Sequence, residues 1–171
     1  MIRSLILGRV AAAERDLGQS LDYVREIVRT SLRAFLRFAK LLSVAEYRRA
    51  LPVDASAVAR IVATRDLACG TCTQLEIDQA KKAGASPAVL RAVVDERPEV
   101  LPAELAEVYR FALAVVRSTG EEDALRERVR ARFGAEALVE LALAMASCRA
   151  FPIVKRTLGY ATSCRLVTLR A

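Results

Sequence analysis

Residues 58–72 read VARIVATRDLACGTC, an apolar helical pattern that runs directly into two cysteines separated by two residues. Val58 and Ile61 follow the three-and-four spacing of an amphipathic helix, and the pattern breaks before Gly70 and resumes at about Thr71. Two thiols at positions i and i+3 lie on the same side of a helical turn, close enough for a disulfide after a small adjustment. This stretch therefore predicts two helices with reversible two-electron thiol chemistry at their junction.

The composition around this stretch favours helices throughout. The chain has 171 residues, only 7 glycines and 5 prolines, and an aromatic content of 5%. A chain of this length buries roughly 70% of the surface that it exposes when unfolded, which is enough for one core without disulfides. We therefore expect an all-α protein with a single domain over residues 1–171, in which residues 1–20 are a candidate N-terminal extension.

Charge and cysteine usage indicate the setting in which the protein works. The net charge is +7, but the arginines are spread along the chain and alternate with glutamates, so we expect a solvated surface and no nucleic-acid partner. The four cysteines are too few for a disulfide scaffold, which favours the reducing cytoplasm. The N-terminus lacks the apolar region of a signal peptide, and no run approaches the roughly 18 apolar residues of a membrane span.

The N-terminal part of the chain predicts a long amphipathic helix over residues 21–42. Arginines 25, 29, 33 and 37 form a basic stripe beside its apolar face. One interpretation is a helix that binds a membrane surface, a nucleic acid or a partner; the other, which we prefer, is a core helix with a charged outer face. Pro52 ends this helix, and Asp54 is a candidate cap for the next.

Residues that typically end or begin helices divide the rest of the chain and predict about seven or eight helices in all. Gly84 is a natural C-terminal stop, and Ser86-Pro87 reads as a cap followed by proline at the first helical position. Gly134 and Pro152 are expected to separate the later helices, and no segment predicts a strand. The expected later helices cover residues 87–94, 102–119, 121–133, 135–150 and 153–169.

A single C-x-x-C has other uses besides redox chemistry. It also forms half of a zinc site, but Cys148 and Cys164 do not form a second C-x-x-C and the chain has no histidine, so we expect no metal. A thioredoxin-like site would need a preceding strand, which is not predicted. We interpret Cys148 and Cys164 as core thiols rather than as a second redox pair.

The surroundings of the motif favour a thiolate. If a helix begins after Gly70, the positive end of its dipole stabilises a negative sulfur, and Arg65 adds to this if it lies near. In thiol exchange the more exposed sulfur meets an external disulfide, and Cys69 is a candidate for that position.

Residues 58–72, the helix expected over 73–83 and the turn Gly84-Ala85-Ser86 together resemble the carboxymuconolactone decarboxylase and alkylhydroperoxidase D superfamily. The segments LPAELAEVYRFA from Leu101 and FGAEALVELALA from Phe133 resemble its following helices, so the likeness covers about residues 21–169.

This resemblance implies an all-helical fold that assembles as trimers or hexamers. It also implies that Cys72 attacks a peroxide oxygen and becomes a sulfenic acid, which Cys69 resolves into a disulfide. A peroxide or disulfide is then the substrate, no cofactor is bound, and an external dithiol or disulfide reductase supplies the electrons.

The sequence departs from this family where a proton relay is expected. Ala57 and Glu76 occupy the positions of the relay glutamate and histidine, and Thr71 stands where a histidine is frequent. Without histidine we reject the decarboxylase activity. An ordinary carboxylate is too acidic to take a proton from a thiol, so Glu76 is a candidate base only if it is buried; the alternative is a solvated glutamate on an exposed helix face.

We therefore expect a cytoplasmic, homo-oligomeric thiol–disulfide oxidoreductase that reduces peroxides, with Cys69, Cys72 and Glu76 as its candidate catalytic residues. The alternative is a non-enzymatic scaffold of the same fold, whose cysteines sense oxidation or only pack.

Overall fold

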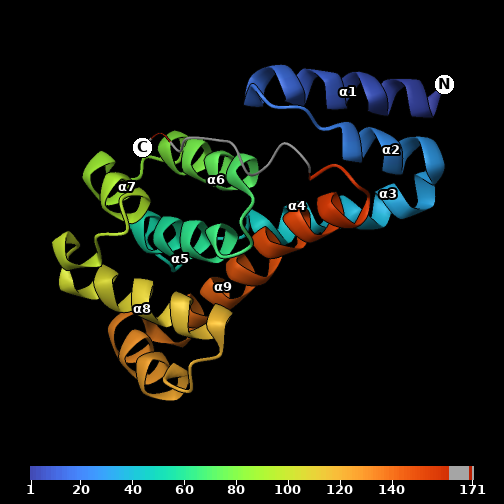
Figure 1. The fold of residues 1–171 in the computed structure, drawn as a ribbon. Coiled ribbons are helices and arrows are strands. Elements are labelled where there is room, and N and C mark those ends of the chain that lie inside the picture. The colour runs from blue at the N-terminus through green and yellow to red at the C-terminus, as the bar shows by residue number, and fades with distance from the viewer. Residues whose placement is uncertain (162–169, 171) are drawn as a thin grey trace.

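The structure is a computed structural model that describes residues 1–161 and 170, and these residues form helices and turns without a strand (Figure 1). The predicted all-α class is therefore confirmed. The elements in chain order are α1 (Ile2–Leu17), α2 (Asp22–Thr30), α3 (Leu32–Phe38), α4 (Lys40–Ala45), α5 (Val53–Arg65), α6 (Gly70–Lys82), α7 (Pro87–Val94), the 3₁₀ turn η1 (Pro98–Val100), α8 (Ala103–Arg117) and α9 (Glu122–Thr157).

Helix α5 lies at the centre of the main hydrophobic core. It packs against α6, α7, α8 and α9, and Val58 and Ile61 are fully buried at these contacts. Leu90 of α7, Val108 of α8 and Leu141 of α9 fill the space around it. The apolar spacing read from residues 58–62 thus marks a helix that is covered on several sides, and the CxxC follows directly from its C-terminal end.

A second, smaller core joins the N-terminal helices to the far end of α9. Tyr23 and Val24 of α2 are buried there with Val10 of α1. The ring of Phe38 packs edge-on against Tyr23 and against Phe151 of α9, with centroid distances of 6.2 and 5.7 Å. Helix α9 runs from α8 to this second core, so it connects the two ends of the molecule (Figure 1).

The prediction of one long helix over residues 21–42 is wrong, because this segment forms three short helices, α2, α3 and the start of α4. Ser31 has an extended backbone (φ −150°, ψ 107°), and its hydroxyl accepts a hydrogen bond of 3.1 Å from the backbone N–H of Ala34. A serine cap of this kind ends one helix and begins the next inside an otherwise continuous apolar pattern. The basic stripe is divided accordingly, and Arg25 forms an ion pair with Glu14 of α1.

Gly134 interrupts α9 as expected, whereas Pro152 does not. Gly134 has φ 89° and ψ 168°, a conformation that only glycine adopts readily, so residues 122–133 and 135–157 are separate helical segments. Pro152 is buried inside the second segment, which continues to Thr157. Proline removes one helical hydrogen bond, but packing on both sides of it can hold the helix. Residues 162–169 of the last expected helix, including Cys164, lie outside the described residues.

A loop is fastened to α9 by a buried carboxylate. Glu140 is 1% exposed and accepts hydrogen bonds of 2.7–3.1 Å from the backbone N–H groups of Arg49, Ala50 and Leu51. Burial alone would raise the pKa of Glu140, but these three N–H groups and the charge of Arg48 outweigh it, and the pKa is lowered.

Helix α9 bears on the expectation that the chain has no membrane span, which stays a prediction. It contains an 18-residue window of mean hydropathy 1.7, of which 44% is buried, so its length and composition would allow it to cross a membrane. One such helix is a weak indication, because core helices of soluble proteins have the same length and composition.

Candidate functional site

The two cysteines lie where the chain turns from α5 into α6. Ala68 has a positive φ of 51°, and its N–H bonds to the carbonyl of Arg65 at 2.8 Å, which closes the turn. Cys69 precedes the first residue of α6, and the Thr73 hydroxyl donates to the Cys69 carbonyl at 2.9 Å. The predicted break and restart are therefore confirmed, and Cys72 lies in the first turn of a helix whose N-terminal end carries partial positive charge.

Cys69 and Cys72, called here the dithiol pair, are in direct contact. The Cys69 thiol donates to the Cys72 sulfur, with 2.9 Å between the two Sγ atoms. Cys69 is 2% exposed, whereas Cys72 is partly exposed. The suggestion that Cys69 is the more accessible sulfur is therefore wrong. Because the chain enters α6 from the packed end of α5, the first cysteine is covered and the second faces outward.

A lysine reaches the dithiol pair from the other end of the chain. Lys155 of α9 is 9% exposed, and its Nζ donates to Thr71 Oγ1 at 2.9 Å. Thr71 Oγ1 lies 3.7 Å from Cys69 Sγ. The sequence reasoning missed Lys155. The available signal was its position seven residues after Cys148 on the buried face of the helix, where a lysine is unusual.

Tyr23 is a second functional candidate that sequence reasoning missed. It is buried in the N-terminal core on α2. Burial, together with the negative charges of Cys72 and Cys69, raises the pKa of Tyr23. The hydroxyl therefore stays protonated and feels the charge of both sulfurs. No sequence signal separates this tyrosine from an ordinary core aromatic, because its nearness to the pair depends on how α2 packs.

Glu76, the candidate base, is buried and forms an ion pair with Arg60. It is 6% exposed, which excludes the alternative of a solvated glutamate, and its Oε2 accepts a hydrogen bond of 2.6 Å from Arg60 Nε. Arg60 also donates to the Ala45 carbonyl and, at 3.4 Å, to Gln79. Burial alone would lower the pKa of Arg60, but the charge and hydrogen bond of Glu76 raise it.

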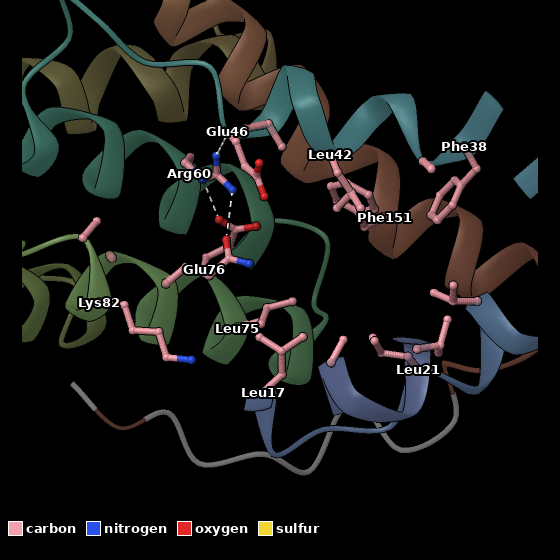
Figure 2. A pocket seen from close by; sticks show the side chains of 18 of the residues that line it. Leu17, Leu21, Phe38, Leu42, Glu46, Arg60, Leu75, Glu76, Lys82 and Phe151 are labelled. Carbon is pink, nitrogen blue, oxygen red and sulfur yellow. Dashed lines mark hydrogen bonds and ion pairs between the residues drawn. The ribbon is translucent and has the colours of Figure 1, made fainter. Parts of the chain in front are cut away.

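A large cavity lies beside this ion pair. It has a volume of about 1000 Å³, is open to solvent on one side, and is lined by residues of α1 to α6 and α9. Figure 2 shows Arg60 between Glu46 and Glu76 at one end and apolar side chains, among them Leu21 and Phe151, at the other. Ala57, where the resemblance to that superfamily would place a relay glutamate, lines the same cavity. The space beside Ala57 is therefore open, and the carboxylates that share the cavity with it are Glu46 and Glu76.

Other candidates near the motif have structural partners elsewhere. Arg65 bonds to the carbonyls of Val93 and Val94 at 3.1 and 2.7 Å and pairs with Glu96, so it is directed toward α7 and not toward the dithiol pair. Asp54 does not cap its own helix, because its carboxylate accepts from the backbone N–H of Ser86 at 2.8 Å.

Cys148 is a core thiol, as predicted. It is 1% exposed, and it donates to the carbonyl of Met145 at 3.3 Å. Burial, followed by the charge of Glu76, raises the pKa of Cys148 to about 12. Cys164 lies outside the described residues, so its predicted core position is untested. Within residues 1–161 and 170, no three His, Cys, Asp or Glu side chains gather into a metal-binding set.

No model of a known protein family matches this chain, and no curated protein matches it. The likeness of residues 58–86 to the alkylhydroperoxidase D superfamily thus stays a prediction, whose test is the chemistry of the dithiol pair.

Proposed function

We propose that this protein is a thiol–disulfide oxidoreductase of the alkylhydroperoxidase D-like type, which reduces peroxides or disulfides through Cys69 and Cys72. The observation that carries the proposal is the contact of 2.9 Å between the two sulfurs at the start of α6, with the second sulfur partly exposed. A disulfide has a sulfur–sulfur bond of about 2.05 Å, so closing the bond requires a shift of about 1 Å. Neither helix has to unfold for the pair to change oxidation state.

The proposed reaction has two steps on the protein. The Cys72 thiolate attacks one peroxide oxygen, so an S–O bond forms and the O–O bond breaks; the leaving oxygen takes a proton and departs as an alcohol or water. Cys69 then attacks the sulfenic sulfur of Cys72, a disulfide forms, and the hydroxyl group leaves as water after taking a proton. Two electrons from an external dithiol or a disulfide reductase restore the thiols.

The different exposure of the two sulfurs supports this division of roles. A nucleophile that meets an external substrate must be accessible, and Cys72 is the partly exposed member of the pair. Cys69 is buried, and its Sγ lies 2.9 Å from the Sγ of Cys72. It can therefore react with Cys72 but is shielded from solvent. The start of α6 places the positive end of the helix dipole at the same point, which favours a thiolate there.

We further propose that the protein works in the cytoplasm as a homo-oligomer, a trimer or hexamer, built on the outer face of α9. Val139, Leu143 and Ile153 are exposed apolar residues along this helix. An apolar stripe of this length on a single chain is typical of a subunit interface. Leu143→Lys should lower the mass measured by sedimentation; an unchanged mass, with the wild-type protein monomeric, would contradict the assembly.

Peroxide consumption by the full chain, with a small dithiol as reductant, tests the proposed function. We expect activity to survive Cys148→Ser and Cys164→Ser and to be lost in Cys72→Ser. Without reductant, Cys69→Ser should still consume one equivalent of peroxide and retain a sulfenic acid that a dimedone reagent traps. If the wild-type protein consumes peroxide and disulfide no faster than the reductant alone, the non-enzymatic scaffold replaces the enzyme.

A further inference from the structure

Lys155 is a buried cation without a carboxylate partner among the described residues. Its Nζ donates to Thr71 Oγ1 at 2.9 Å, and none of the ion pairs formed within residues 1–161 and 170 includes it. Burying an ammonium away from a compensating charge is costly, because the charge loses its hydration. The position of Lys155 therefore needs an explanation, and a negative charge arises 3.7 Å from its hydrogen-bond partner when Cys69 ionises.

The threonine hydroxyl links the lysine to the first cysteine. Thr71 Oγ1 accepts from Lys155, and it is also in hydrogen-bond contact with Cys69 Sγ at 3.7 Å, a contact in which either group can donate. The Cys69 sulfur is in turn 2.9 Å from Cys72 Sγ. The four groups thus form one chain, from the ammonium to the hydroxyl, then to the buried Cys69 and to the partly exposed Cys72.

We propose that Lys155, acting through Thr71, is a positioning residue that stabilises the thiolate of Cys69. This inference rests on the proposed function, in which Cys69 resolves the sulfenic acid. It also assigns Cys69 as the leaving group during reduction: an external thiolate attacks Cys72, the Cys69–Cys72 bond breaks, and Cys69 departs with the electron pair. A thiol with a lower pKa leaves faster.

The electrostatic surroundings agree with this assignment. From other helices, Tyr23 of α2 interacts electrostatically with both sulfurs, and Lys155 of α9 donates to Thr71 beside them. On α6 itself Glu76 follows one turn later, but its charge is compensated by Arg60 of α5. Arg156, next to Lys155, bonds to the Leu67 carbonyl before the motif. These neighbours are the phenol of Tyr23, the cations Lys155 and Arg156, and a carboxylate, Glu76, whose charge is compensated by Arg60. This combination favours a thiolate.

The test is a titration of Cys69 that needs no turnover. In a Cys72→Ser, Cys164→Ser background only Cys69 and Cys148 remain as thiols. Because the pKa of Cys148 is about 12, thiolate that forms at lower pH belongs to Cys69. We expect Lys155→Met to lower the thiolate fraction near neutral pH about tenfold, the equivalent of one pKa unit, as followed by thiolate ultraviolet absorbance. Thr71→Val should act in the same direction, and Thr71→Ser should restore the original titration because it keeps the hydroxyl.

Lys40→Met, which removes an exposed lysine, is the matched control and should leave the titration unchanged. If Lys155→Met does not fold, the Thr71→Val and Thr71→Ser pair decides the question alone. Superimposable titrations of these folded variants would overturn the inference, even if peroxide turnover is present. A shifted titration in a protein without turnover would instead contradict the proposed function and leave the lysine assignment intact.

Discussion

Arg60 Nε lies 2.6 Å from Glu76 Oε2, and this buried ion pair occupies the place where a base for the dithiol pair was expected. Oε2 of Glu76 is bound to the guanidinium of Arg60, so this carboxylate is held in an ion pair. Arg60 in addition holds the end of α4 through the Ala45 carbonyl. The pair therefore fastens α4, α5 and α6 together beside the cavity, and its first role is structural.

Glu76→Gln should lower the free energy of unfolding strongly and the reactivity of the dithiol pair only slightly. Removing one partner of a buried ion pair leaves an uncompensated charge and costs about 3–5 kcal/mol, although a glutamine that still accepts from Arg60 keeps part of this. Urea unfolding measures the change, and the double variant Arg60→Met, Glu76→Leu should recover part of the loss. A Glu76→Gln protein of wild-type stability that has lost turnover would show that Glu76 is the base after all.

The two kinds of cysteine should differ in alkylation. Cys72, partly exposed at the start of a helix, should react with iodoacetamide at neutral pH faster than a free cysteine. Cys148, with a pKa of about 12 and 1% exposure, should react only after unfolding. Mass spectrometry of partially labelled protein measures both rates. Labelling of Cys148 at the rate of Cys72 in the folded protein would contradict the assigned roles.

Glu140 should make stability depend on pH. Its pKa is lowered in the folded protein, so its contribution is present above the unfolded value of about 4.3 and is lost as pH falls through the lower folded value. Glu140→Gln should cost about 2–4 kcal/mol at pH 7, because the charge is lost and an NH₂ donor replaces one of the two oxygens that accept from the loop N–H groups. The difference from wild type, measured by denaturant unfolding, should shrink below about pH 4. A difference that is constant down to pH 3 would contradict the lowered pKa.

Gly134→Ala should destabilise the protein by about 1–3 kcal/mol, because φ 89° and ψ 168° strain any residue with a Cβ atom. No other atom lies within 4 Å of the added Cβ, so the cost is in the backbone alone. Gly8→Ala is the matched control: Gly8 lies inside α1 with equally open space, and alanine there should be neutral or stabilising. Thermal unfolding distinguishes the two, and equal melting temperatures for both variants would refute the assignment of strain.

The sequence alone determined the features that depend on local spacing. The all-α class, the helix that runs into Cys69, the restart before Cys72 and the breaks at Gly84 and Gly134 all follow from apolar periodicity and from residues with restricted backbone preferences. The contact between the two sulfurs was predictable for the same reason, because an i, i+3 spacing at a helix start fixes it.

Only the tertiary structure decided what surrounds the dithiol pair. Lys155 lies 84 positions from Thr71 in the sequence, and the charges of the two sulfurs raise the pKa of Tyr23 on α2, so neither interaction has a local signature. The burial of Glu76 and its pairing with Arg60 likewise depend on how α5 and α6 pack. Periodicity specifies which face of a helix is covered but not which charged group from a distant segment shares the covered space, and the chemistry of this pair depends on those groups.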